Sequence, residues 1–275
     1  MFKIHLKDTV LDLTTPLVMG ILNATPDSFF KGSRMEHIDA GVKKAIEMAQ
    51  FGASIIDIGG QSTRPGAEII TQAIEIERVV PMIKAIHSAL PHIPISVDTY
   101  HAGVAKAAIN AGALIVNDIS CGNFDPKMIA TVVANQVGYI GMHQTGGPGS
   151  MHEVLSRNNI MDTLKAYFLL KKRQFAEIGL TQWIIDPGFG FSKTLEENFE
   201  LVKSLGQLKS LDLPILLGVS RKSSIYKTLG VDADAALNGT TVMNTIGLQG
   251  GANILRVHDV KEAKEAILLI EQMKA

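Results

Sequence analysis

The fold is decided where the first apolar run ends, in Leu17-Val-Met-Gly-Ile-Leu22 followed by Asn23-Ala-Thr-Pro26. The run has the length and the nearly continuous apolar character of a strand that is buried on both faces. An open doubly wound sheet, the main alternative, is expected to place a glycine-rich G-x-G-x-x-G turn directly after this strand. That turn is absent from the sequence, so the first unit favours a closed arrangement of strands and helices.

Seven further apolar runs follow, and amphipathic stretches alternate with them. The runs are residues 54–58, 93–97, 113–116, 137–142, 183–185, 215–219 and 252–257. The amphipathic stretches are residues 38–52, 71–90, 104–111, 126–134, 160–178, 195–205, 233–248 and 261–273. Eight strand–helix units in succession predict an α/β fold of the TIM (β/α)8 barrel type.

The remaining residues extend this prediction without adding a second unit. Residues 1–14 predict a short N-terminal β-hairpin that plugs one end of the barrel. No linker or low-complexity tract interrupts the chain of 275 residues. Because barrels of about 250 residues are typical single domains, we expect one domain over residues 1–275.

Composition excludes several classes of protein. The 26 Lys and Arg residues and 27 Asp and Glu residues give a formal net charge of −1, which argues against nucleic acid or an acidic membrane surface as partners. The single cysteine, Cys121, excludes an internal disulfide and a multi-cysteine metal site, and suits a cytoplasmic protein. We see no signal peptide in residues 1–13 and no apolar run of about 18 residues.

Polar side chains follow every predicted strand at the point where it ends. They are Asn23, Asp57, Asp98, Asn117, His143, Asp186, Lys222, Arg256 and His258. A lone Asp at such a place is usually a helix cap, as Asp118 or Asp259 could be. Since the carboxyl ends of barrel strands meet at one mouth, the whole set predicts a single polar basin.

The order of charges along the chain suggests what this basin binds. Acids and amides follow the second, third, fourth and sixth strands, whereas Lys222, Arg256 and His258 follow the seventh and eighth. Arg256 and His258 are two residues apart, so on an extended segment they face the same way and could hold an anion. A ligand with a donor-rich polar heterocycle at one end and an anion at the other would fit.

Seven motifs at these strand ends resemble the signatures of dihydropteroate synthase. They are MGILNATPDSF (19–29), DIGGQSTRPG (57–66), ISVDT (95–99), ND (117–118), DPGFGF (186–191), GVSRKS (218–223) and RVHDV (256–260). The resemblance runs in order from about residue 17 to 260. It implies a transferase of folate biosynthesis that condenses 6-hydroxymethyl-7,8-dihydropterin diphosphate with 4-aminobenzoate, giving 7,8-dihydropteroate and diphosphate. It also implies Mg²⁺, a cytoplasmic homodimer, and competition by sulfonamides for the aminobenzoate site.

The resemblance assigns roles position by position. The pterin-binding residues it implies are Asp57, Asp98, Asn117, Asp186 and Lys222. The diphosphate-binding residues are Asn23, Arg64, Arg256 and His258, with Asn23 also the metal ligand. The 4-aminobenzoate-binding residues are Thr63, Pro65, Phe191 and Ser223. The catalytic residues are Asp98, Lys222 and Arg256.

The mechanism that we favour on this basis is dissociative, or SN1-like. The CH₂–O bond breaks first, Mg²⁺ and Arg256 take up the charge of the departing diphosphate, and Asp98 stabilises the pterin cation. The neutral aniline nitrogen then attacks the methylene group. Residues 24–35 and 60–69 are expected to close over this step and exclude water. No covalent enzyme intermediate is needed, so Cys121 is expected to be structural.

The sequence departs from the family pattern at three places. They are Lys31, where an acidic residue is usual, Gln61, where Glu is frequent, and residues 144–150. These departures concern loop closure more than pterin binding, because none of them removes a proposed ring or anion contact.

Three other functions stay open from the sequence. A non-catalytic pterin-binding homologue would bind the ring without releasing diphosphate. A methyltetrahydrofolate-dependent methyltransferase would have no reason to keep residues 62–66 or the Arg-Lys-Ser at 221–223. A sugar-phosphate barrel is compatible with the fold, but fold alone does not decide function.

Overall fold

Eight parallel strands form the centre of the molecule. The computed structural model describes residues 2–7, 9–25, 34–61, 67–151, 153–154 and 158–273. The strands are β3 (Leu17–Asn23), β4 (Ile55–Gly59), β5 (Ile95–Asp98), β6 (Ile115–Asp118), β7 (Gly138–Met142), β8 (Ile184–Asp186), β9 (Leu216–Leu217) and β10 (Ile254–Val257). Their order in the sheet is β8-β7-β6-β5-β4-β3-β10-β9, with every pair parallel.

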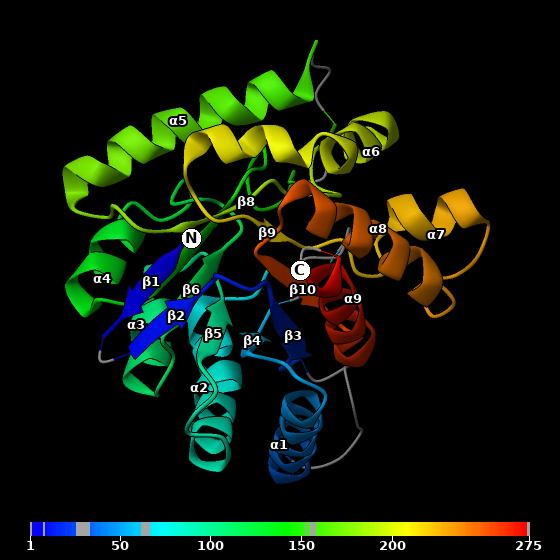
Figure 1. Cartoon of the computed structure of the whole chain (residues 1–275). Helices are drawn as coiled ribbons and strands as arrows, with labels where there is room; N and C mark the ends of the chain where they lie inside the picture. The colour runs from blue at the N-terminus through cyan, green and yellow to red at the C-terminus, as the bar shows by residue number, and fades with distance from the viewer. Residues whose placement is uncertain are drawn as a thin grey trace.

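The two edges of this sheet meet and close the barrel. An isolated parallel bridge joins Ile185 of β8 to Ile215, and the Ile185 N–H donates to the carbonyl of Pro214 at 2.9 Å. Helices surround the strands, as Figure 1 shows. The predicted TIM barrel is thereby confirmed.

Eight helices lie close to the predicted amphipathic stretches. They are α1 (Arg34–Gln50), α2 (Gln72–Ala89), α3 (Ala102–Asn110), α4 (Met128–Asn135), α5 (Ile160–Ile178), α6 (Leu195–Lys203), α8 (Leu237–Gly250) and α9 (Val260–Gln272). The bounds of α5 match the prediction because both ends carry clear signals. The Asn159 side chain accepts from the N–H of Met161 at 2.9 Å, and Gly179 ends the helix at a left-handed φ of 95°.

Two short helices are not among the predicted amphipathic stretches, and one strand is shorter than expected. The additions are α7 (Ser223–Leu229) and the 3-10 helix η2 (Leu205–Leu211). Each spans seven residues, too few for a clear 3.6-residue pattern. β9 has two residues because the chain turns soon after it, with the Lys222 N–H donating to the carbonyl of Val219 at 3.2 Å.

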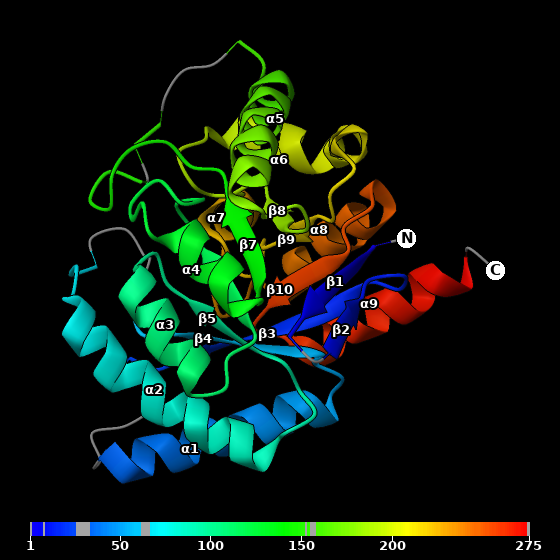
Figure 2. The same ribbon diagram turned by 90° about the vertical axis from the view of Figure 1, so that its left-hand side faces the viewer.

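The N-terminal hairpin closes one mouth of the barrel, as predicted. β1 (Lys3–Leu6) pairs antiparallel with β2 (Thr9–Asp12). Its buried side chains pack against one inward residue from each of seven strands, and we call this group the plug layer. It consists of Ile4, Leu6, Leu11, Leu13, Met19, Ile55, Ile115, Ile140, Ile184, Leu216 and Ile254. The hairpin lies on the right in Figure 2, and the loops that follow the strands lie on the left.

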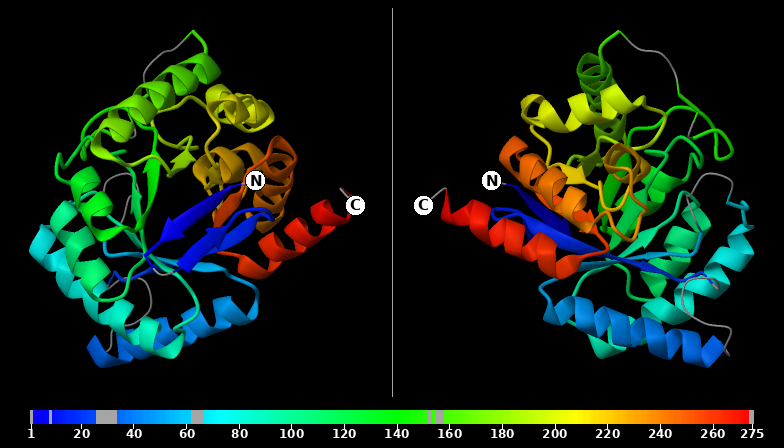
Figure 3. Two further views of the ribbon diagram at one scale, coloured as in Figure 1. Left: turned by 60° about the vertical axis from the view of Figure 1, so that its left-hand side comes forward. Right: turned by 90° about the vertical axis from the view of Figure 1, so that its right-hand side faces the viewer.

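A second apolar cluster fills the space between the barrel and the helices. On α2, for example, Val79, Met82, Ile83 and Ile86 form the buried stripe. β1 and the end of α9 lie on the same side of the barrel in Figure 3, away from the loops that follow the strands.

Within the described residues, no helix combines the length and apolar character that a membrane span requires.

Two residues beyond the plug layer, the inward-facing side chains of several strands are polar instead of apolar. Side chains two residues apart on a strand share a face. Asp57, Asn117, Asp186 and Arg256 each lie two residues after an isoleucine of the plug layer. We call these four residues, together with Asp98 and Lys222, the site layer. The alternation of the strands therefore places ionisable groups at the open mouth.

Candidate active site

Arg256 lies at the centre of the site layer, between two carboxylates. Its Nε donates to Asp57 Oδ2 at 2.6 Å, and its Nη2 donates to Asp98 Oδ2 at 2.6 Å. Asn117 Nδ2 donates to the same Asp57 oxygen at 3.0 Å. Asp57 is fully buried and Asn117 is 3% exposed. Four strands thus contribute to one buried network at the mouth.

Burial and neighbouring charges shift the pKa values of Asp98 and Arg256. It raises the pKa of Asp98 to about 7, and the neighbouring Asp57 adds to the rise while Arg256 opposes it. Burial alone would lower the pKa of Arg256, but Asp57 and Asp98 outweigh it and raise that pKa. The guanidinium therefore stays charged, and Asp98 can exist in either protonation state near neutral pH.

Asp186 and Lys222 form a second acid–base pair. Asp186 is 7% exposed, and its Oδ1 accepts from the Gly188 N–H at 2.7 Å. Burial raises the pKa of Asp186, against the opposing charge of Lys222. Burial lowers the pKa of Lys222 to about 8, and Asp186 limits that fall. Each partner therefore favours the charged form of the other.

The two pairs share one basin across β9. A Cβ placed on Gly218, just after β9, would lie 3.9 Å from Arg256 Cβ and 4.0 Å from Asp186 Oδ2. The glycine therefore leaves room between the two groups that a side chain would fill. The basin combines carboxylate and amide acceptors with two cations, which suits a ligand carrying both N–H donors and ring acceptors.

An apolar cluster borders this basin. Phe191 packs with Tyr100, Ile119, Met142 and Met151, and all five are buried. The Lys222 Nζ lies 4.4 Å from the centre of the Phe191 ring and also donates to the carbonyl of Phe189. An aromatic face beside a cation is suited to a flat ligand that carries negative charge.

The other predicted site residues lie at the rim of the mouth or outside the described residues. Asn23 ends β3 opposite Gly59, which is itself opposite Asp98. His258 is exposed, and both its backbone N–H and its Nδ1 lie near Ser220 Oγ, at 3.1 and 3.0 Å. Ser223 is exposed at the first position of α7. Thr63, Arg64 and Pro65 lie outside the described residues, as does Lys31.

Two acids that follow strands have structural partners. Asp118 accepts from the Ser120 N–H, the Ser120 hydroxyl, the Gly122 N–H and the Tyr139 hydroxyl, at 2.7 to 2.8 Å. Asp259 accepts two hydrogen bonds from the Arg221 guanidinium, at 2.8 and 2.9 Å. Arg221 has a left-handed φ of 53° and precedes Lys222. Asp259 therefore holds the turn that presents Lys222.

Sequence reasoning missed two buried charged residues beside the site. Glu75 is 1% exposed, and burial raises its pKa to about 7, while a hydrogen bond from the Thr99 side chain opposes the rise. Its signal was its position, four residues before Val79 on the apolar stripe of α2. Lys193 is 5% exposed and follows the DPGFGF motif by two residues.

Cys121 takes no part in this network. Its side chain is fully buried, and burial raises the pKa of its thiol to about 12. A thiol with such a pKa is not a nucleophile at neutral pH. This agrees with the structural role expected from the sequence.

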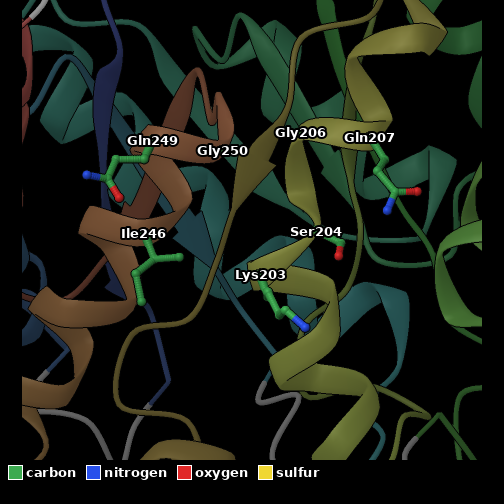
Figure 4. A pocket seen from close by; sticks show the side chains of 7 residues that line it. All are labelled: Lys203, Ser204, Gly206, Gln207, Ile246, Gln249 and Gly250. Atoms are coloured by element: carbon green, nitrogen blue, oxygen red, sulfur yellow. The ribbon is translucent and has the colours of Figure 1, made fainter.

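A hollow in the outer wall lies apart from the site layer. It has a volume of about 510 Å³ between α6 with η2 on one side and α8 on the other. Figure 4 shows Lys203, Ser204 and Gln207 on one side of it and Ile246 and Gln249 on the other. It shares no residue with the site layer, so the hollow is no part of the candidate active site.

Comparisons with known proteins agree with the geometry of the mouth. Residues 19–258 match the family of pterin-binding enzymes. The chain is 42% identical over 247 residues to dihydropteroate synthase of Synechocystis sp., covering 89% of this chain and 85% of that protein. It is 38% identical over 271 residues to dihydropteroate synthase of Escherichia coli K12, covering 98% and 95%.

Solved structures agree as well. The Yersinia pestis dihydropteroate synthase with a sulfonamide drug is similar with a TM-score of 0.92 and 35% identity, over 99% of both chains. The Xanthomonas albilineans enzyme with 4-aminobenzoic acid is similar with a TM-score of 0.91 and 32% identity, over 100% of this chain and 99% of that one. This chain therefore belongs to the dihydropteroate synthases, a family of pterin-binding transferases.

Proposed function

We propose that this chain condenses 6-hydroxymethyl-7,8-dihydropterin diphosphate with 4-aminobenzoate, forming 7,8-dihydropteroate and diphosphate for folate biosynthesis. One observation carries the proposal: the Asp57–Arg256–Asp98 network and the Asp186–Lys222 pair lie beside Phe191 at a single mouth. The family relationship and the ligands of the similar solved structures support the same reaction. A single pterin-binding domain over residues 1–275 is part of this proposal.

The pterin ring would bind within the site layer. Asp57, Asp186 and Asn117 offer acceptor oxygens for the exocyclic amine and ring N–H donors. Lys222 would donate to a ring acceptor and leave the carbonyl of Phe189 to do so. Because these side chains are buried, their hydrogen bonds to a ligand would be stronger than bonds at the surface.

The diphosphate would lie at the rim above the ring. Asn23, Arg64, Arg256 and His258 are the proposed contacts, and Arg256 is held in reach of this rim by its carboxylate partners. Anion binding by arginine is favourable because its donors match paired oxygens.

Magnesium fits this arrangement as a substrate-borne ion. Among the described residues, no group of three or more His, Cys, Asp or Glu could form a protein cage for a metal. Asn23 at the end of β3 offers one hard amide oxygen, and Mg²⁺ commonly completes its shell with water and phosphate oxygens. When bound, the ion would neutralise charge on the diphosphate.

The chemical step that we propose is dissociative. The CH₂–O bond breaks and the diphosphate leaves with the bonding electrons, with Arg256 stabilising its charge. Asp98 stabilises the positive charge that develops on the pterin. The amine nitrogen of aminobenzoate then forms the new C–N bond and loses one proton.

Aminobenzoate would bind between Phe191 and the start of α7. Phe191 supplies a face for its ring, and the exposed Ser223 supplies a donor for its carboxylate. Thr63 and Pro65 are proposed contacts on the opposite side, and residues 24–35 and 60–69 would exclude water. Sulfonamides would compete here, since the Yersinia pestis enzyme was solved with such a drug.

The test is a turnover assay with the pterin diphosphate, 4-aminobenzoate and Mg²⁺, in which released diphosphate and dihydropteroate are measured. Equal amounts of both products are expected. Binding of the pterin without release of diphosphate would instead favour a non-catalytic pterin-binding protein. Addition of EDTA should suppress turnover and excess Mg²⁺ should restore it; turnover at the full rate in EDTA would remove the metal from the proposal.

We also propose that the enzyme is a cytoplasmic homodimer. Ile246 on α8 lines the hollow of Figure 4 and is 39% exposed, and Val242, four residues earlier on the same helix, is 50% exposed. Apolar side chains that gather on an outer wall favour contact with another protein surface. Sedimentation analysis of the wild type and of Ile246→Glu tests this: a dimer that dissociates in the variant supports the α8 contact.

A further inference from the structure

A buried lysine holds the turn that carries the aromatic wall of the site. The Lys193 Nζ donates to the carbonyls of Gly188 at 2.9 Å, Phe191 at 3.1 Å and His143 at 3.4 Å. It also lies 3.2 Å from His143 Nδ1. The Gly188 carbonyl also accepts from the Phe191 N–H at 3.1 Å, whereas the ammonium is the side-chain donor to the carbonyls of Phe191 and His143, and a buried acceptor that loses its donor is costly. Lys193 therefore joins the loop after β7 to the turn after β8.

The turn at 188–191 is tight, and its other side is bonded too. Gly188 and Gly190 have left-handed φ values of 71° and 82°, and a Cβ on Gly188 would collide with the carbonyl oxygen of His143. Asn198 Oδ1 accepts from the Gly190 N–H at 2.6 Å. Two buried polar side chains, Lys193 and Asn198, thus fix the turn from two sides. Of these two, Lys193 is the one that carries a charge.

The same turn contacts the site layer. Its Gly188 N–H donates to Asp186 Oδ1, and its Phe189 carbonyl accepts from Lys222. Phe191 at its end lies 4.4 Å from the Lys222 Nζ. Displacement of this turn would therefore move the aromatic face first, whereas Asp57 and Asn117 are held by other strands.

We propose that Lys193 is a positioning residue that sets the place of the Phe191 ring and thereby the binding of the aromatic amine substrate. The proposal rests on the proposed function, in which Phe191 faces 4-aminobenzoate. Lys193 does not touch the reacting atoms; it acts through the backbone of the turn. The turn also touches Asp186 and Lys222, but Asp57 and Asn117 lie on other strands, so the loss should be larger for the aromatic amine than for the pterin.

The test compares Lys193→Met with Lys171→Met. Lys171 is a matched control, since it is also buried, donates to Asn123 Oδ1 at 2.6 Å, and makes no contact with the turn. We expect Lys193→Met to raise the KM for 4-aminobenzoate about tenfold, equal to about 1.4 kcal/mol, while the Kd for the pterin changes less than threefold. Lys171→Met should leave both constants near the wild-type values. Equal KM values in the two variants would overturn the proposal, as would a parallel rise in the pterin Kd.

A second measurement keeps this test separate from the proposed function. Amide hydrogen exchange of residues 188–191 should be faster in Lys193→Met than in Lys171→Met, since only the first loses the carbonyl contacts. Equal exchange would overturn the role of Lys193 whether or not the wild type turns over. Absence of dihydropteroate formation by the wild type would overturn the proposed function alone.

Discussion

On β4, β6, β8 and β10 the plug layer and the site layer lie two residues apart, and the plug layer is apolar whereas the site layer is polar or charged. Ile55 and Asp57 of β4 and Ile254 and Arg256 of β10 all lie within the barrel. At the hairpin end, the neighbours are aliphatic side chains that exclude water. At the other end, each polar group is buried only because another group of opposite charge or a hydrogen-bonding partner lies next to it.

The two layers therefore contribute differently to the free energy of folding. Burial of apolar surface stabilises by about 25 cal/mol per Å², so the plug layer adds to folding stability. Burial of charges costs desolvation energy that the ion pairs only partly offset, so the site layer adds little or reduces stability. Substitutions at one end should therefore change stability alone, and substitutions at the other should change turnover.

The largest effect is expected from Asp98→Asn. In the proposed mechanism this substitution removes the charge that stabilises the pterin cation, so kcat should fall about 100- to 1000-fold. The free energy of unfolding at pH 8 should equal or exceed that of the wild type, because the raised pKa of Asp98 means that its ionised form is unfavourable in the fold. Stopped assays and urea unfolding measure the two quantities. A kcat near the wild-type value would remove Asp98 from the mechanism.

A smaller effect, on stability alone, is expected from Leu6→Ala. Leu6 is fully buried in the plug layer, and the cavity left by truncation should reduce the free energy of unfolding by about 3 kcal/mol. Val10→Ala on the same hairpin is the control, because Val10 is 46% exposed and should change stability little. Below the unfolding transition, kcat should match the wild type. A fall in kcat of the folded variant would show that the two ends are coupled, against the division proposed above.

The smallest effect is expected from Glu75→Gln, and it depends on pH. Burial raises the pKa of Glu75 from 4.5 to about 7, so the folded state holds a proton that the unfolded state releases. The stability linked to this proton is complete below pH 4.5 and is lost as pH rises through about 7. Glu75→Gln should remove this part of the pH dependence and be more stable than the wild type at pH 8, by no more than about 3 kcal/mol.

Urea unfolding at pH 5 and pH 8 measures this difference. The pKa of Asp98 is raised as well, so the stability of the Glu75→Gln variant will still depend on pH to some extent. An identical slope in both proteins between pH 5 and pH 8 would contradict the buried position of the Glu75 carboxyl.

The strands, the plug and much of the site were predictable because their signals are local and repeated. Apolar runs that each end in a polar residue fix both the barrel and its mouth, and the period of two places Asp57 above Ile55 and Arg256 above Ile254. The ion pairs of Arg256 with Asp57 and Asp98 were not predicted, because the partners are 199 and 158 residues away in the sequence. The expected diphosphate contacts of Arg256 stay a prediction.

Other features escaped prediction because burial depends on tertiary packing. Lys193 resembles a surface lysine after a loop, and its burial arises where the loops after β7 and β8 meet. α7 is too short to show a period, although the serine that begins it was singled out. The roles of Thr63, Arg64 and Pro65 stay predictions, since these residues lie outside the described part of the chain.

The pairing of β10 with β3 sets when activity can arise during synthesis. The Leu17 N–H donates to the carbonyl of Asn253 at 2.9 Å, so the first barrel strand must wait for the last. Contacts of such sequence separation form slowly, and a nascent chain exposes the edge of β3 until residues 254–257 leave the ribosome. Arg256 lies on that final strand, so an incomplete chain lacks both its barrel closure and its central cation.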